Sequence, residues 1–153
     1  MERRIRKLAI QFRTAIEMAK ADGEFNSDFL FPQFPHGCCG DASDLLGQYL
    51  LENGIESYYV CGNRYFDDPE EGTQSHAWLL VEGLIVDITG DQFSDRASYY
   101  NYDEAVYVGI GDSFHDLFEI EDRDVHKFPG IENYGGICLT RLFDLYEKIK
   151  KYL

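Results

Sequence analysis

The sequence is poor in basic residues. It contains 14 Lys and Arg residues against 28 Asp and Glu residues, which gives a formal net charge of −14 at pH 7. Binding to nucleic acid or to an anionic membrane surface depends on basic side chains that neutralise phosphate groups. We therefore expect neither kind of partner, and a net charge of this size favours solubility.

Long hydrophobic runs are also missing. No apolar stretch approaches the roughly 20 residues that a membrane-spanning helix needs. The basic residues 1–7 are not followed by the apolar segment of a secretory signal, because polar side chains interrupt residues 11–20. We therefore expect a cytoplasmic protein with no membrane partner.

Cysteine is scarce and lacks the spacing of common metal sites. The four cysteines are Cys38, Cys39, Cys61 and Cys138, and neither a C-x-x-C nor an H-x-x-x-H pair occurs. Zinc sites are usually built from such pairs. A chain of this length without a secretory signal also does not need disulfide bonds. We therefore expect free thiols, no metal and no cofactor.

Apolar residues are plentiful enough for one core. Hydrophobic residues make up 44% of the 153 residues, so we expect a single domain over residues 1–153. Helical spacing of apolar residues predicts three helices, and runs of β-branched and aromatic residues predict four strands. The helices cover residues 3–21, 39 or 41 to 53, and 140–152; the strands cover 55–61, 76–81, 84–88 and 104–110. This order predicts an α+β domain, with N-terminal helices packed on an antiparallel sheet and a C-terminal helix.

Two segments between these elements read as loops. Residues 63–75 are acidic, and residues 24–37 are irregular with Pro32, Pro35 and Gly37. Four aromatic side chains of the second loop are expected to anchor it to the core: Phe25, Phe29, Phe31 and Phe34.

The predicted hairpin gives a geometric expectation. With Glu82-Gly83 as the turn, Trp78 pairs with Asp87 across the two strands. Side chains alternate along a strand, so His76, Trp78 and Asp87 share one face. Asp87 then lies diagonal to His76 and within side-chain reach, where a carboxylate can fix the tautomer and stabilise the charged form of the imidazole. The alternative is that Asp87 caps the turn after its strand.

A pair of cysteines stands where a helix is predicted to begin. The helix dipole and its unpaired N–H groups favour an anion there, which lowers the pKa of a thiol and makes it nucleophilic. Cys38 and Cys39 are both candidates, and a buried, inert thiol is the commoner outcome. Cys61 and Cys138 are expected to be core thiols.

These features belong to a longer pattern. The motifs occur in this order: Cys39-Gly-Asp41, a Leu-rich helix ending at Gly54-Ile55, Tyr59-Val-Cys-Gly62, His76-Ala-Trp78 and Asp87-Ile-Thr89. The pattern resembles the transglutaminase-like superfamily of papain-fold proteins. The resemblance implies a papain/transglutaminase-like core, with Cys39 as nucleophile, His76 as general base and Asp87 as the residue that orients the histidine. It also favours Cys39 over Cys38.

Three further residues are candidates for binding the oxyanion or the substrate. Gln33 precedes Cys39 by six residues, which is similar to the spacing of the oxyanion glutamine in papain-type enzymes. Gln92 is its rival for the same role. Trp78 lies either beside the site or in the core.

The resemblance implies a thiol-dependent acyl-transfer enzyme, either an amide or peptide hydrolase or an acyltransferase. Its substrate is expected to be a peptide or a small-molecule amide. One alternative is a binding or scaffold module that keeps the fold without turnover. Another is a metal-binding regulator that uses Cys38, Cys39 and His76.

Overall fold

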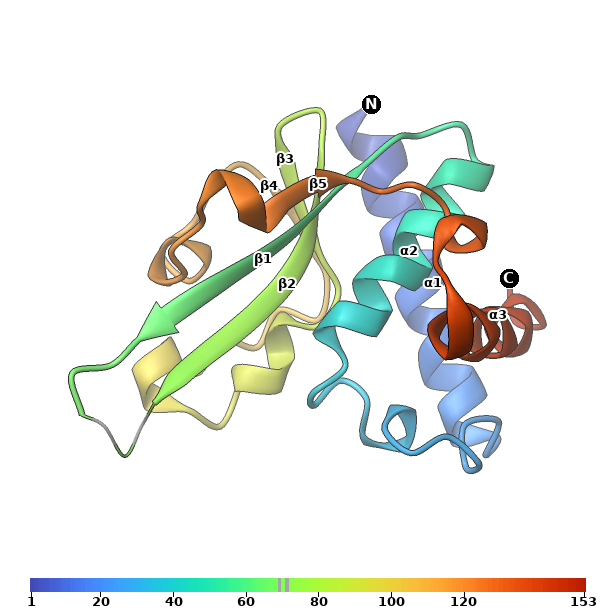
Figure 1. Cartoon of the computed structure of the whole chain (residues 1–153), viewed down its shortest axis with the longest axis horizontal. Helices are drawn as coiled ribbons and strands as arrows, with labels where there is room; N and C mark the ends of the chain where they lie inside the picture. Colours follow the sequence, from blue (N-terminus) through green and yellow to red (C-terminus); the bar gives the residue numbers. More distant parts are fainter. Residues whose placement is uncertain (69, 71) are drawn as a thin grey trace.

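The computed structural model describes residues 1–68, 70 and 72–153. Within these residues the chain forms three α-helices and one five-stranded antiparallel sheet (Figure 1). The helices are α1 (Glu2–Ala21), α2 (Cys39–Glu52) and α3 (Gly136–Lys150). The strands are β1 (Tyr58–Tyr65), β2 (Thr73–Val81), β3 (Leu84–Asp87), β4 (Tyr107–Gly109) and β5 (Val125–Lys127). The predicted α+β class and the C-terminal helix are confirmed.

The sheet has the order β4-β3-β2-β1-β5, and each pair of neighbours is antiparallel. Helices α1 and α2 contact the sheet, while α3 packs on α1 and α2. Figure 1 shows the three helices gathered on one side of the strands. A mainly aliphatic core fills the space between the helices and this face of the sheet. No helix of the described residues is long and apolar enough to cross a membrane.

The hairpin of β2 and β3 has the predicted register. Val81 pairs with Leu84, so the turn consists of Glu82 and Gly83. Both turn residues have positive φ, 51° and 81°, as a two-residue type I′ turn requires. The diagonal relation of His76 to Asp87 follows from this register.

The strands around the acidic loop are longer than the sequence predicts. β1 continues to Tyr65 and β2 begins at Thr73, and these two residues pair with each other. The expected loop over residues 63–75 is therefore wrong at both ends. The side chains there are mostly polar and do not show the apolar alternation from which a strand is predicted. The hydrogen-bonded ladder of β1 and β2 nevertheless continues through these residues. Residues 69 and 71 of that loop lie outside the described residues.

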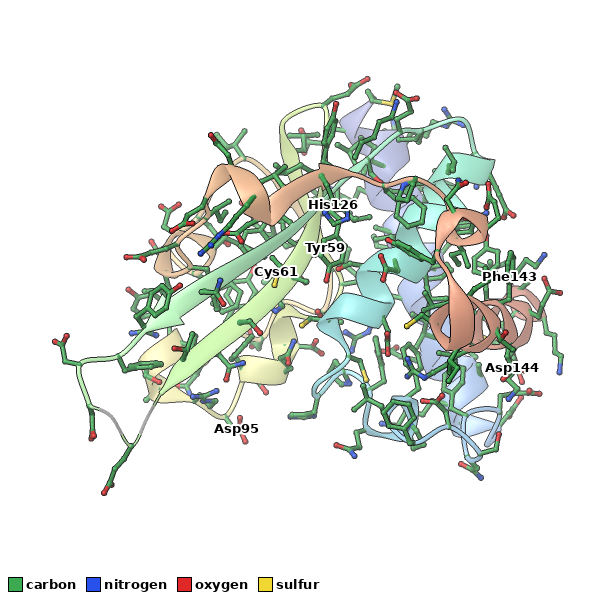
Figure 2. All side chains as sticks on the ribbon, in the orientation of Figure 1. Tyr59, Cys61, Asp95, His126, Phe143 and Asp144 are labelled. Atoms are coloured by element: carbon green, nitrogen blue, oxygen red, sulfur yellow. The ribbon has the colours of Figure 1, made fainter. Side chains whose placement is uncertain are left out.

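The edge strand β5 has no counterpart among the predicted strands. It pairs with β1, so that His126 stands opposite Tyr59 and the two rings stack with centroids 5.1 Å apart (Figure 2). Three residues are too few to produce a clear alternating pattern, which explains why this strand was not predicted.

The segment before α2 is anchored by aromatic side chains, with one exception. Phe29 is 78% exposed and lies over the guanidinium of Arg141, so its expected burial is wrong. Asp28 holds Arg141 in this position, because the guanidinium binds the Asp28 carboxylate through two nitrogens at 2.9 and 3.0 Å. The remaining three are buried as expected: Phe25, Phe31 and Phe34.

The face of the sheet opposite the helices carries a second core. Three short 3-10 helices cover this face: Gly90–Phe93, Ala97–Tyr99 and His115–Leu117. Its buried members are largely aromatic: Val60, Trp78, Ile85, Phe93, Tyr99, Phe114 and Phe118. We call this set the aromatic cluster.

Candidate active site

Cys39 occupies the first position of α2, and its thiol meets the middle of the sheet. Its side chain is hydrogen-bonded to His76, and the backbone N–H of Ala77 donates to it. Burial acts to raise the pKa of Cys39, but the hydrogen bond and charge of His76 outweigh burial, so the pKa is lowered below its usual value. This thiol is therefore held in an environment that favours the thiolate.

The sheet leaves room for the start of α2 at this place. β3 pairs with β2 from Leu79 to Val81, whereas the earlier residues of β2 pair with β1. The side of β2 at Ala77 therefore faces the first turn of α2 rather than a strand. Because the β2–β3 ladder ends at the pair of Leu79 and Val86, the start of α2 can reach a residue in a central strand.

Cys38 has the opposite environment although it is the adjacent residue. It is fully buried, and its Sγ lies 3.4 Å from the carbonyl oxygen of His36 and 3.8 Å from that of Leu30. Burial raises its pKa to about 12. The structure thus brings Cys39 and not Cys38 to His76, and the trio of Cys38, Cys39 and His76 is not assembled.

The other two thiols differ from the sequence expectation. All four cysteines are free. Cys61 on β1 is half-buried, and burial followed by the nearby Cys39 raises its pKa. Cys138 is exposed at the start of α3, so its expected place in the core is wrong.

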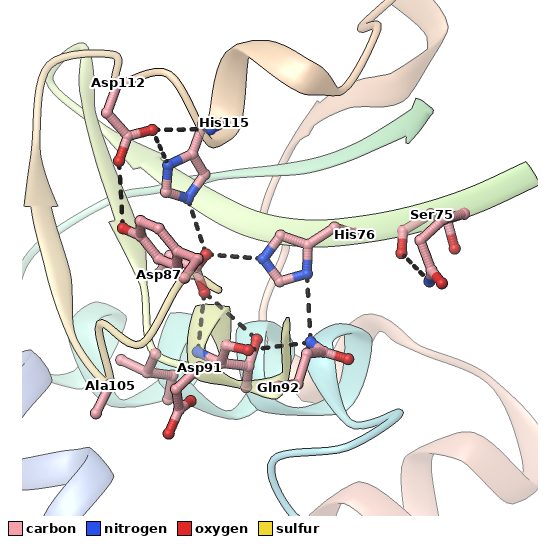
Figure 3. Close-up of polar contacts among 12 residues, drawn as sticks. Ser75, His76, Asp87, Asp91, Gln92, Ala105, Asp112 and His115 are labelled. Carbon is pink, nitrogen blue, oxygen red and sulfur yellow. Dashed lines mark hydrogen bonds and ion pairs between the residues drawn. The ribbon is translucent and has the colours of Figure 1, made fainter. Parts of the chain in front are cut away.

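His76 and Asp87 are joined as the hairpin register predicts. Nε2 of His76 lies 2.7 Å from Oδ2 of Asp87, and both side chains are buried (Figure 3). Burial acts to lower the pKa of His76, but the carboxylate of Asp87 and then Cys39 raise it to about 9. Burial acts in the opposite direction on Asp87, whose pKa is nevertheless held far below its usual value by His76 and His115. The pair is therefore charged at neutral pH.

Asp87 also caps the turn after its strand, which was the alternative expectation for this residue. Its second oxygen, Oδ1, accepts the backbone N–H of Thr89 at 2.9 Å and the hydroxyl of Thr89 at 3.3 Å. The carboxylate thus caps the turn after β3 with one oxygen and faces His76 with the other. Orientation and capping occur together, because each uses a different oxygen.

Gln92, rather than Gln33, lies at this site. Its Nε2 is 3.4 Å from Nδ1 of His76 and donates to the carbonyl of Thr89 at 3.1 Å. Its Oε1 accepts the N–H of Gly37 at 3.3 Å, which ties it to the loop before α2. Gln33 is exposed in the short helix Phe31–Gln33.

Trp78 shares the face of His76, as the alternation along β2 predicts. Its ring centroid is 5.6 Å from that of His76 and 5.0 Å from that of His115. It is 1% exposed. In this conformation Trp78 packs beneath the imidazoles and offers no open surface to a substrate.

Arg13 of α1 fixes the segment that carries Gln92. It is buried, and its guanidinium binds both oxygens of Asp91 at 2.8 Å and the carbonyl of Ile88 at 2.7 Å. Sequence reasoning did not single out Arg13. Arg13 lies within the apolar stripe of an amphipathic helix. A charge in that position needs a buried partner, so the sequence pattern could have indicated an ion pair there.

A second histidine, for which no role was expected, also contacts Asp87. Nε2 of His115 lies 2.8 Å from the same Oδ2 that faces His76, while Nδ1 of His115 lies 2.7 Å from Oδ1 of Asp112 (Figure 3). The only local signal is the Asp-x-x-His spacing, which lets Asp112 also accept the backbone N–H of His115. No strand register connects this turn with β3.

Comparison with known protein families, curated proteins and solved structures finds no match.

The residues of the site themselves indicate its chemistry. The arrangement joins a helix-start thiol, an imidazole and a carboxylate in the order that activates a nucleophile. The carboxylate faces the ring nitrogen remote from the thiol, so the remaining nitrogen is available for proton exchange with Cys39.

Among the described residues, His76, Asp87 and His115 form the one group whose spacing suggests a metal site, with ligand atoms within 4.8 Å of one another. Ligand atoms on a tetrahedral zinc ion lie about 3.3 Å apart, given zinc–ligand distances of about 2.0–2.1 Å. The two N–O distances here, 2.7 and 2.8 Å, are those of hydrogen bonds. The geometry is thus that of a hydrogen-bonded cluster.

Proposed function

We propose that this protein is a thiol-dependent acyl-transfer enzyme with a papain/transglutaminase-like core. One observation carries the proposal: Cys39, His76 and Asp87 form a continuous series of hydrogen bonds at the start of α2. The proposed substrate is a peptide or a small molecule with an amide or ester carbonyl.

The first half of the reaction forms an acyl-enzyme. In the resting site the thiol proton of Cys39 has already passed to Nδ1 of His76, because the pKa of Cys39 is lowered and that of His76 is raised, while Nε2 donates its own hydrogen to Asp87. Sγ bonds to the carbonyl carbon, and the electrons of the C=O double bond move to oxygen. When the C=O bond re-forms, the bond to the leaving amine or alcohol breaks, and this group takes the proton from His76. The acyl group remains on Cys39 as a thioester.

Gln92 is the residue that we propose as an oxyanion donor. The amide Nε2 of Gln92 lies 3.4 Å from Nδ1 of His76. Nδ1 of the charged His76 carries hydrogen and accepts no hydrogen bond, so this amide N–H can donate to the substrate oxygen. The first N–H groups of α2 have no acceptor within the helix and provide further donors.

The second half of the reaction returns the free thiol. His76 removes a proton from water or from a second amine, which attacks the thioester carbon. The C–S bond then breaks, and Cys39 leaves as the thiolate beside His76, which keeps the proton that it removed. Water gives a carboxylic acid and an amine gives a new amide, so hydrolysis and transfer share the same residues.

Thiol reactivity tests the site directly. Iodoacetamide at pH 6 should alkylate Cys39 about tenfold or more faster than Cys38 and Cys61, since alkylation requires the thiolate. Peptide-level mass spectrometry measures each rate. His76→Ala should remove this selectivity, whereas the exposed Asp95→Asn should leave it unchanged.

Turnover is measured with p-nitrophenyl acetate. We expect a burst of one p-nitrophenolate per chain, followed by slower release, and neither in Cys39→Ser. Slow and equal alkylation of all four thiols would overturn the proposal. Selective alkylation without a burst would instead favour the alternative of a catalytically silent module.

A further inference from the structure

His115 is clamped between two carboxylates by both of its ring nitrogens. Nε2 lies 2.8 Å from Asp87 and Nδ1 lies 2.7 Å from Asp112. An ionised carboxylate accepts hydrogen bonds and cannot donate them. Both contacts are therefore hydrogen bonds at the same time only when both ring nitrogens carry hydrogen, which is the imidazolium form.

The other contacts of the two carboxylates agree with ionised groups. Asp112 accepts the backbone N–H of His115 at 2.8 Å and the hydroxyl of Tyr102 at 3.2 Å. Asp87 accepts from Thr89 with Oδ1 and faces two imidazole nitrogens with Oδ2. Each of the four oxygens thus faces a donor, which is the surrounding of a carboxylate and not of a protonated acid.

The surroundings of His115 contain few other titratable groups. It is 2% exposed and sits between the rings of Trp78, Tyr102 and Tyr107 at centroid distances of 5.0 to 5.8 Å. The charged or titratable groups that face it are His76 from β2, Asp87 from β3, Tyr107 from β4, and Asp112 and Tyr102 from the adjoining loops. A cation on His115 is thus matched by the two carboxylates that it contacts.

We propose that His115 and Asp112 are positioning residues, and that the His115 imidazolium keeps Asp87 ionised and aimed at His76. The inference rests on the proposed function, since it extends the series Cys39–His76–Asp87 by two groups. Asp87 would otherwise be a buried carboxylate whose charge is balanced by a single histidine that must gain and lose a proton. His115, as a second cation beside the same oxygen, keeps the Asp87 carboxylate in place while His76 gains and loses its proton.

The geometry predicts graded effects of two substitutions. In His115→Gln the side-chain amide can still donate to Asp87 but carries no charge. In His115→Asn the shorter amide keeps the side facing Asp112 and loses Asp87. Removal of a nearby cation disfavours the Cys39 thiolate, so the acidic limb of its alkylation profile should move to higher pH in both variants. At pH 6 the rate should fall about threefold in Gln and about tenfold in Asn, which correspond to roughly half and one unit of thiol pKa.

The experiment follows iodoacetamide alkylation of Cys39 from pH 4 to 9 in both variants, with circular dichroism to show that each is folded. Asp116→Asn is the matched control, because Asp116 is exposed on the same short helix and should leave the profile unchanged. Nitrogen-15 NMR of the wild type at pH 7 reports whether both ring nitrogens of His115 carry hydrogen. Folded variants with the wild-type profile, or a single protonated nitrogen on His115, would overturn the inference.

Failure of this inference can be distinguished from failure of the proposed function. If wild-type Cys39 is not selectively alkylated at pH 6, the proposed function fails whatever the state of His115. If Cys39 is selective and the two variants retain its profile, only the positioning role is lost. If one variant does not fold, the other variant and the NMR measurement still decide the question.

Discussion

The two faces of the sheet bury different kinds of groups. The face under α1 and α2 packs mainly aliphatic side chains, whereas the opposite face packs the aromatic cluster around the polar series of His76, Asp87 and His115. Rings enclose these polar groups but leave their hydrogen-bonding atoms facing one another. The buried series of His76, Asp87 and His115 thus lies on one face, and that face meets Cys39.

The pKa values of two carboxylates, Asp44 and Asp87, show the effect of these different surroundings. Asp44, on α2, has the hydroxyl of Tyr134 as a partner at 2.7 Å, and burial raises its pKa to about 6. Asp87 is more deeply buried, yet two histidines keep its pKa far below the usual value. Burial alone therefore drives a carboxyl group towards its neutral form, and cationic partners reverse this effect.

Asp87→Ala should have the largest effect, because it removes the acceptor shared by two buried histidines. We expect a loss of about 3–5 kcal/mol in the free energy of unfolding, since the imidazole N–H groups are left buried without a partner. Urea denaturation measures the change. The alkylation rate of Cys39 at pH 6 should fall as well, since His76 is no longer stabilised as a cation. A normal rate in the folded variant would show that the carboxylate does not act on the thiol.

Leu145→Ala tests the helical face with a change of similar size. Leu145 is fully buried in α3, so its truncation should lower the free energy of unfolding by about 3 kcal/mol through lost burial and a residual cavity. The pH profile of Cys39 alkylation should remain that of the wild type. A shifted profile would mean that packing on the helical face influences the thiol, and that the two faces are not independent.

Two parts of the site could be predicted from the sequence, because each depends on residues close together in the chain. The hairpin turn sets the register that brings His76 to Asp87, and the cysteine pair stands at a helix start. His115 was not predictable, because its contact with Asp87 depends on how a turn folds over the sheet. The choice between Gln33 and Gln92 likewise depended on the path of the chain after β3, which Arg13 fixes from a distant helix.

The same distinction holds for the fold. The longer elements were predicted within a few residues, since their apolar spacing is regular. β5 is set by its pairing with β1, and the outward position of Phe29 by the cation of Arg141. Both depend on contacts far apart in the sequence, which a local pattern does not contain.

Asp44→Asn should stabilise the protein at neutral pH. The folded state holds the Asp44 proton more tightly than the unfolded state does, with a pKa of about 6 against 3.8. The contribution of Asp44 to stability is therefore most favourable below pH 3.8 and decreases as the pH rises through 6. Removal of the charge should raise the free energy of unfolding at pH 7 by about 1–3 kcal/mol. Urea denaturation at pH 4 and pH 7 measures this difference, and the exposed Asp95→Asn serves as control. An equal change at both pH values would contradict the assignment to charge burial.

Cys38→Ala should have the smallest effect and compares two adjacent residues. The thiol of Cys38 is fully buried among apolar groups and makes weak contacts with two carbonyl oxygens. Its loss should cost about 1 kcal/mol in the free energy of unfolding, because the cavity is small. Alkylation of Cys39 at pH 6 should proceed at the wild-type rate, since His76 and the start of α2 are untouched. If the variant instead lost its alkylation at pH 6, the reactive thiol would be Cys38, and the difference between the two environments would not control reactivity.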